Sequence, residues 1–177
     1  IVELANFKTK NAISFDNYIQ TLLDNIKSLS INHDIQSIGI GAPNFDSKSN
    51  EFRPVNFPWN DLRPFNLKSF IQKNLNINTY VVNDANAAAW GEAKFGAGRN
   101  QNHMMMLTVG TGIGGGIVVN GALYRGAFGI AAEFGHLRVV PDGHLCGCGA
   151  RGCFEQYASG NALLRHAREA INASPEI

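Results

Sequence analysis

The stretch TYVVNDANAAAWGEAKFG, residues 79–96, indicates the fold class of the chain. Its first four residues, Thr79 to Val82, are β-branched or aromatic and predict a strand. The alanine-rich run from Ala85 to Gly96 predicts a helix, because alanine has the highest helix propensity. Asn83 and Asp84 lie where this strand passes into the helix. A strand that leads directly into a helix is the repeating unit of an α/β layer.

The upstream elements continue this alternation of strand and helix. Apolar residues recur at helical spacing from Phe15 to Leu29, and Ser14 is placed to cap that helix. A strand is predicted over Ile35 to Ile40 and a short helix over Leu67 to Leu75. Residues 44–66 are polar and interrupted by prolines, which predicts a long loop. The order of these elements favours an α/β fold.

The downstream half predicts short strands followed by a helical segment. Strands are predicted over Met104 to Val109, Ile117 to Val119 and Leu137 to Val140. A glycine-rich turn joins the first two, and Asn120-Gly121 is typical of a two-residue hairpin. Phe154 to Ala173 is predicted to be mainly helical, with a break at Ser159-Gly160.

The composition excludes several classes of partner. Hydrophobic residues make up 45% of the 177 residues, enough for a sizeable core. The net charge of +1 lacks the clustered basic excess of a nucleic-acid or anionic-membrane surface. The apolar runs are too short to cross a bilayer. We therefore expect a globular α/β protein with no membrane partner and no nucleic-acid partner for this segment.

The Asn83-Asp84 pair has two interpretations. Aspartate is a good helix N-cap, because its carboxylate accepts a hydrogen bond from an amide of the first turn. Alternatively, a carboxylate at the carboxyl end of a strand lies where α/β proteins bind ligands. There it could accept a hydroxyl proton during phosphoryl transfer, which makes Asp84 a candidate catalytic base.

The glycine-rich run from Gly110 to Gly116 is a second candidate site. It formally matches the dinucleotide-binding fingerprint, but a strand and an Asn-Gly turn follow it instead of the required helix. It also lacks the Gly-Lys-Ser/Thr ending of a P-loop. Glycines let backbone amides approach phosphate oxygens closely, and Thr111 adds a hydroxyl. A tight turn without a ligand is the alternative.

One histidine and three cysteines form a potential metal site. His136, Cys146, Cys148 and Cys153 offer one imidazole and three thiolates, which suits tetrahedral zinc. Four protein ligands leave no open position, so a structural zinc is favoured over a catalytic one. The alternative is three unrelated small buried residues. Glu133 and Glu155 flank these ligands, and a folded metal loop would bring their carboxylates close together unless both are solvated on the surface.

Four segments together resemble the ROK family of bacterial repressors and sugar kinases, from about Ile35 to about Ala167. The segments are Gly39 to Pro43, Asn83 to Ala88, the run from Val109 through Gly116, Gly126, Gly135 and His136, and the set His136, Cys146-x-Cys148-Gly149-x-x-Gly152-Cys153-x-Glu155. The spacing of the last set is highly specific.

The resemblance implies an actin-like (ribonuclease H-like) two-lobed sugar kinase fold with a zinc-binding loop. Residues 1–94 would belong to the N-terminal lobe and residues 95–177 would begin the C-terminal lobe. It also implies ATP with Mg²⁺ in the cleft, and Asp84 as the base that takes the proton of a hexose 6-hydroxyl. By the same resemblance the hexose contacts are Asn56, Asn83, Asp84, Glu133, His136 and Glu155. The nucleotide contacts are Gly110, Thr111, Gly112, Gly114 and Gly115, and the zinc ligands are His136, Cys146, Cys148 and Cys153.

The sequence also departs from the family pattern. The family's opening Asp-x-Gly-Gly-Thr phosphate loop is absent, and Asn44 stands where glycine is common. We therefore expect the chain to be a fragment that lacks material at both ends and is incomplete for activity. A cytoplasmic location and a homodimer are further expectations.

Three functions stay open at this point. The first is an ATP-dependent hexose kinase resembling the glucokinase branch. The second is a sugar-responsive transcriptional repressor of the same family, whose DNA-binding segment would lie outside this chain. The third is a zinc-stabilised binding module without chemistry. Asp84 favours the kinase, because a sensor has no need for a base.

Overall fold

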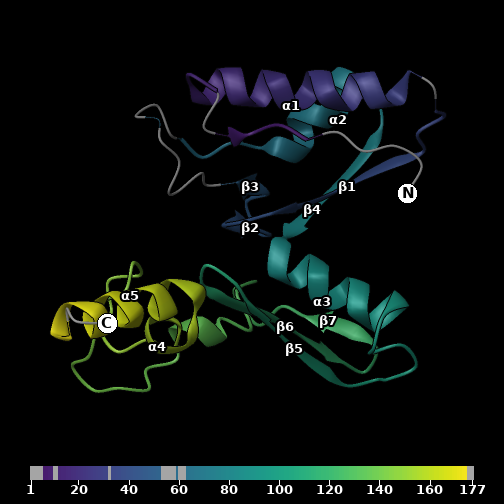
Figure 1. Ribbon diagram of the computed structural model, residues 1–177. Helices are drawn as coiled ribbons and strands as arrows, with labels where there is room; N and C mark the ends of the chain where they lie inside the picture. The colour runs from purple at the N-terminus through teal and green to yellow at the C-terminus, as the bar shows by residue number, and fades with distance from the viewer. Residues whose placement is uncertain (1–5, 10–11, 32, 53–58, 60–62, 175–177) are drawn as a thin grey trace. The chain divides into compact units, whose positions relative to one another are not determined.

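The computed structural model (Figure 1) describes residues 6–9, 12–31, 33–52, 59 and 63–174. Contacts within the chain define two compact units, Ile1–Asp84 and Ala85–Ile177. Among the described residues, no helix combines the length and the apolar content needed to span a membrane.

The first unit contains two helices and a pair of parallel strands. Helix α1 (Phe15–Ser30) is capped by Ser14, whose Oγ accepts the Asn17 amide at 3.1 Å. Helix α2 (Leu67–Leu75) has the predicted bounds. Strand β1 (Ser37–Ala42) begins and ends two residues later than predicted. It pairs in parallel with β4 (Asn78–Asn83). Both strands therefore end at the same edge, with Ala42 opposite Asn83.

The segment predicted as a long polar loop is partly a hairpin that contributes to the core. Strands β2 (Phe45–Asp46) and β3 (Glu51–Phe52) pair antiparallel. Phe45 and Phe52 are buried, together with Trp59. They pack in one cluster with the buried residues of α1 and α2. The prediction of a polar loop was wrong here because two-residue strands have no detectable periodicity.

Asn44 lies in the turn before this hairpin, where the family commonly has glycine. Its φ is 52°, in the left-handed region. Asparagine adopts that conformation more readily than most non-glycine residues, because its short polar side chain can bond locally. The departure from the family pattern therefore leaves the backbone of the turn intact.

The second unit is a three-stranded antiparallel sheet with helices. Helix α3 (Asp84–Phe95) leads into β5 (Met104–Val109), β6 (Ile113–Val119) and β7 (Ala122–Tyr124), in the order β5-β6-β7. The predicted Asn-Gly hairpin joins β6 to β7, with φ of 51° at Asn120 and 72° at Gly121. Strand β5 lies at the edge, and its Met105, Leu107 and Val109 side chains are exposed.

The glycine-rich run is mostly strand, which corrects the prediction of a turn over its whole length. Only residues 110–112 form the turn, and Gly114, Gly115 and Gly116 lie inside β6. A side chain at 116 would begin 2.4 Å from the Ala89 Cβ of α3, and one at 115 would begin 2.4 Å from the Phe134 ring. These glycines are required by close packing on both faces of the sheet.

A 3₁₀ turn, a loop and two helices complete the unit. The strand predicted over residues 137–140 is not formed. This segment makes only an isolated bridge, between Arg138 and Cys153. The 3₁₀ turn η2 (Phe134–His136) precedes this loop, and α4 (Glu155–Ala158) and α5 (Gly160–Ala173) follow it. The predicted helix break is confirmed, since Ser159 caps α5 by accepting the Ala162 amide at 3.2 Å.

Candidate functional site

Asp84 follows directly on the last residue of β4 and is the first residue of α3. A carboxylate in the first helical turn is stabilised by the helix dipole. The position is also the carboxyl edge of the parallel pair β1–β4, where α/β proteins bind ligands. Asp84 is therefore not the N-cap of α3, a position that falls to Asn83, while its place at the strand edge suits the chemical interpretation.

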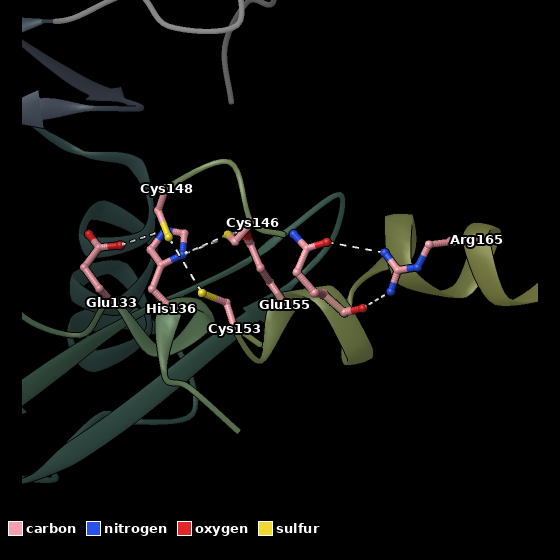
Figure 2. Close-up of polar contacts among 8 residues, drawn as sticks. Glu133, His136, Cys146, Cys148, Cys153, Glu155 and Arg165 are labelled. Atoms are coloured by element: carbon pink, nitrogen blue, oxygen red, sulfur yellow. Dashed lines mark hydrogen bonds and ion pairs between the residues drawn. The ribbon is translucent and has the colours of Figure 1, made fainter. Parts of the chain in front are cut away.

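The four predicted metal ligands converge in the second unit (Figure 2). The ligand atoms of His136, Cys146, Cys148 and Cys153 all lie within 4.8 Å of one another. The Sγ atoms of Cys148 and Cys153 are 3.7 Å apart, and Cys146 Sγ is 3.6 Å from His136 Nδ1. A tetrahedral zinc with Zn–S bonds of about 2.3 Å requires sulfur–sulfur separations of about 3.8 Å. The donor set fits such an ion in both chemistry and spacing.

Two glycines shape the loop that carries the cysteines. Gly149 and Gly152 have φ of 89° and 80°, in the left-handed region. A side chain at Gly152 would begin 1.7 Å from the carbonyl oxygen of Val140, so no other residue fits there without a shift of the backbone. The glycines therefore let the chain fold tightly enough for Cys148 and Cys153 to meet.

The thiols have unequal proton affinities. The pKa of the Cys146 thiol is raised to about 12, mainly by burial and in smaller part by the contact with Glu155. Burial also raises the pKa of Cys153. The backbone hydrogen bond from Ala150 is the main cause that lowers the pKa of Cys148. Because thiolates are the metal-binding form, the two buried thiols would release protons when an ion binds.

The two predicted glutamates approach His136 from different ring nitrogens. Glu133 Oε2 lies 4.0 Å from Nε2, and Glu155 Oε1 lies 3.9 Å from Nδ1. Glu155 Oε1 also accepts a hydrogen bond from the Cys146 thiol at 3.1 Å. The sequence thus identified two carboxylates that the fold brings to one imidazole.

The glycine turn lies against the start of α5. The Gly160 amide donates to the Gly110 carbonyl at 2.7 Å, and the Asn161 amide donates to the Thr111 carbonyl at 3.4 Å. Of the predicted nucleotide contacts, Gly110, Thr111 and Gly112 form this turn, whereas Gly114 and Gly115 lie within β6. An open pocket of about 470 Å³ adjoins the turn. It is lined by Val109, Gly110, Tyr157, Ala158, Ser159, Gly160, Leu163 and His166.

Some contacts around the site were not predicted from the sequence, and one predicted residue lies outside the described part of the chain. Gly160 holds the turn, and its only signal was the expected helix break at Ser159-Gly160. Arg165 donates to both the side chain and the backbone carbonyl of Gln156, which ties α5 to α4 (Figure 2). No pattern in the sequence pointed to this contact.

Asn56, predicted to contact the sugar, lies outside the described residues.

A sequence profile of the ROK family matches residues 5–176. The chain belongs to the ROK family. Among ROK proteins it is 43% identical to a glucokinase from Streptomyces coelicolor over 175 residues, which cover 98% of this chain and 54% of that protein. A xylose repressor from Bacillus spizizenii is 44% identical over 130 residues, which cover 72% of this chain and 33% of that protein.

A solved structure gives the same family. The ROK glucokinase from Streptomyces griseus, in complex with glucose and AMPPNP, has a TM-score of 0.75 at 46% identity, covering 92% of this chain and 52% of that one. The chain therefore has the α/β fold of ROK sugar kinases. It spans about half the length of the curated ROK relatives that it matches.

Proposed function

We propose that the protein is an ATP-dependent hexose kinase that phosphorylates the 6-hydroxyl of glucose or a related sugar. The observation that carries the proposal is the Asn83-Asp84 pair at the shared carboxyl edge of β1 and β4. A carboxylate at this edge suits the role of a base for an alcohol nucleophile. The identity of 43% and 46% with two glucokinases supports the same activity.

The proposed reaction needs one proton transfer and one displacement. Asp84 accepts the proton of the hexose 6-hydroxyl as its oxygen attacks the γ-phosphorus of ATP. The bond from that phosphorus to the bridging oxygen breaks, and ADP leaves with the electron pair. Mg²⁺ bound with ATP would supply positive charge beside the phosphate oxygens. The turn formed by Gly110, Thr111 and Gly112 would place the backbone amides of Thr111 and Gly112 near those oxygens.

The same proposal includes a structural zinc at His136, Cys146, Cys148 and Cys153. In support, His136 turns Nδ1 toward Cys146 at 3.6 Å and Nε2 toward Glu133 at 4.0 Å. One ring nitrogen is therefore available to the ion and the other faces a carboxylate, which orients the ring. Zinc would hold the loop so that Glu133, His136 and Glu155 can bind hexose hydroxyls. Asn83 and Asn56 complete the proposed hexose contacts.

A repressor of the same family is the second candidate, and the 44% identity to a xylose repressor favours it. A sugar-responsive repressor would bind its sugar without transferring phosphate. The two functions differ in whether Asp84 acts as a base. A cytoplasmic location and a homodimer stay predictions for both.

The test is substitution of the base. In the intact protein, Asp84→Asn keeps the size of the side chain but cannot accept the proton. We expect kcat to fall by about 10²- to 10⁴-fold, the range that a general base contributes, while the affinity for the hexose is kept. A coupled assay of ADP release and calorimetric titration of glucose measure the two quantities.

Asp24→Asn is the matched control, because Asp24 is an exposed residue of α1 that accepts a hydrogen bond from Gln20 at 2.9 Å. Its turnover should equal that of the unmodified protein. Undiminished turnover in Asp84→Asn would refute the assignment of the base. Hexose binding without turnover in the unmodified protein would favour the repressor.

A further inference from the structure

Gly112 is the point at which the glycine turn meets the carboxylate of Glu155. A side chain at position 112 would begin 2.8 Å from Glu155 Oε2. This is well inside the separation of about 3.5 Å at which non-bonded atoms attract. The backbone at Gly112 is not in the left-handed region, so alanine fits the backbone itself. The obstacle to a side chain at this position is therefore the carboxylate.

The other oxygen of the same carboxylate lies at the metal-ligand cluster. Glu155 Oε1 is 3.1 Å from Cys146 Sγ and 3.9 Å from His136 Nδ1. The side chain of Glu155 is only 20% exposed. Its carboxylate therefore fills the space between the turn and the cluster, with one oxygen on each side.

The turn cannot easily retreat from Glu155. The Gly110 amide donates to the Gly112 carbonyl at 3.0 Å, and the Gly110 carbonyl accepts the Gly160 amide at 2.7 Å. The Thr111 carbonyl also accepts the Asn161 amide at 3.4 Å, so the first residues of α5 hold the turn at two points. A side chain at 112 would be relieved mainly by displacing the carboxylate.

We infer that Gly112 is a positioning residue for Glu155, and through Glu155 for the hexose. Because position 112 has no side chain, the Glu155 carboxylate can lie between the turn and His136. A residue of the turn that was predicted to contact only the nucleotide then also determines sugar affinity. The inference rests on the proposed kinase function for the identity of its ligand, although the contact between Gly112 and Glu155 is independent of it.

The kinetic test asks which substrate is affected. In Gly112→Ala we expect the KM for glucose to rise by about tenfold, equivalent to about 1.4 kcal/mol, with a smaller change in the KM for ATP. Gly91→Ala is the control, because Gly91 lies in α3 outside the proposed contacts and a side chain there meets no atom within 4 Å. Its KM for glucose and its KM for ATP should both stay unchanged. A rise confined to the KM for ATP in Gly112→Ala would overturn the inference.

A shorter acid at position 155 provides the rescue. Glu155→Asp withdraws the carboxylate by one methylene and makes room for the added methyl group. The double variant Gly112→Ala/Glu155→Asp should have the same KM for glucose as Glu155→Asp alone. Effects that multiply in the double variant would show that the two positions act separately.

A melting experiment separates this inference from the proposed function, since it needs neither hexose nor ATP. Gly112→Ala should lower Tm more in the unmodified protein than in a Glu155→Ala background, because only the unmodified protein has a carboxylate that the new methyl group must displace. Equal shifts in both backgrounds would overturn the inference even in an active kinase. Should Gly112→Ala alone fail to fold, folding of the double variant would support the inference, and its failure would contradict it.

Discussion

Cys153 is the most deeply buried member of the metal-ligand set, with no exposed surface. Its Sγ lies 3.7 Å from that of Cys148, and Arg138 pairs with its backbone across the loop. A thiol in this position contributes both a ligand and a packing contact. At the scale of single residues, it is the strictest test of the proposed zinc site.

Cys153→Ser should lose the metal, because a hydroxyl is a far weaker zinc ligand than a thiolate. We expect the unmodified protein, purified without chelators, to contain about one zinc ion per chain, and the variant to contain well below half of that. Elemental analysis by mass spectrometry measures the content. His144→Ala is the control, since His144 lies in the same loop but outside the ligand set. Equal zinc in Cys153→Ser and the unmodified protein would count against the site.

At the scale of elements, the hairpin β2–β3 is a larger part of the first unit than its length suggests. Phe52 is 3% exposed and its backbone bonds to Phe65 in both directions, at 2.8 and 3.0 Å. The hairpin therefore joins the segment before α2 to the core under α1. Its aromatic side chains, and not its few ladder hydrogen bonds, hold it in place.

Phe52→Ala should destabilise the protein by about 3–5 kcal/mol, the usual cost of removing a buried aromatic ring. The loss combines the transfer free energy of the ring with the cavity that it leaves. Denaturant unfolding followed by circular dichroism measures it. Ile13→Ala is the control, because Ile13 is 89% exposed and should change stability by less than about 0.5 kcal/mol. A cost as small as that of the control would show that the hairpin does not pack as described.

The contact between α3 and β6 offers a second comparison at this scale. Gly116→Ala would place a methyl group 2.4 Å from Ala89 Cβ and should cost about 1–3 kcal/mol, because the helix must move away from the sheet. Gly91 lies in α3, and a side chain there meets no atom within 4 Å. Gly91→Ala should therefore raise the free energy of unfolding by up to about 1 kcal/mol, because alanine has the higher helix propensity. Thermal unfolding of the two variants should shift in opposite directions. Shifts of the same sign would refute this account of the packing.

The sequence predicted elements with local periodicity well and missed those defined by distant contacts. α2 and β5 have the predicted bounds, because each carries its own pattern of apolar residues. Gly114 to Gly116 were not recognised as strand, since glycine has low β-propensity. Glycine is needed at 115 and 116 because Phe134 and α3 pack closely against the strand there, which the local sequence does not reveal. The convergence of His136, Cys146, Cys148 and Cys153 was predictable, because cysteine and histidine at that spacing have few uses other than metal binding. The contact between Gly112 and Glu155 was not, because it depends on where α4 begins.

At the scale of the whole molecule, the chain consists of two compact units with separate stabilising features. The core under α1 holds the first unit, and the metal-ligand loop lies entirely within the second. The proposed ion should therefore stabilise the second unit, because ligand binding protects the structure that contains the site.

Removal of the metal should loosen the protein locally. After treatment with a zinc chelator, we expect amide hydrogen exchange to increase in residues 136–160 and to stay unchanged in α1, since local opening follows the loss of local contacts. Hydrogen exchange measured by mass spectrometry resolves the two segments. Reloading with zinc should restore slow exchange. Equal loss of protection in α1 would mean that the ion supports the whole molecule, contrary to this account.

Among the described residues β5 pairs on one side only, with β6, so we expect its outer edge to affect how the protein behaves when it is concentrated. Its backbone groups, beside the exposed side chains of Met105, Leu107 and Val109, give another sheet a place to add a strand. Salts such as sulfate strengthen contacts of this kind. Precipitants rich in sulfate would then favour filaments or amorphous aggregates, and a lysine introduced at position 107 would be the first change to make before crystallisation.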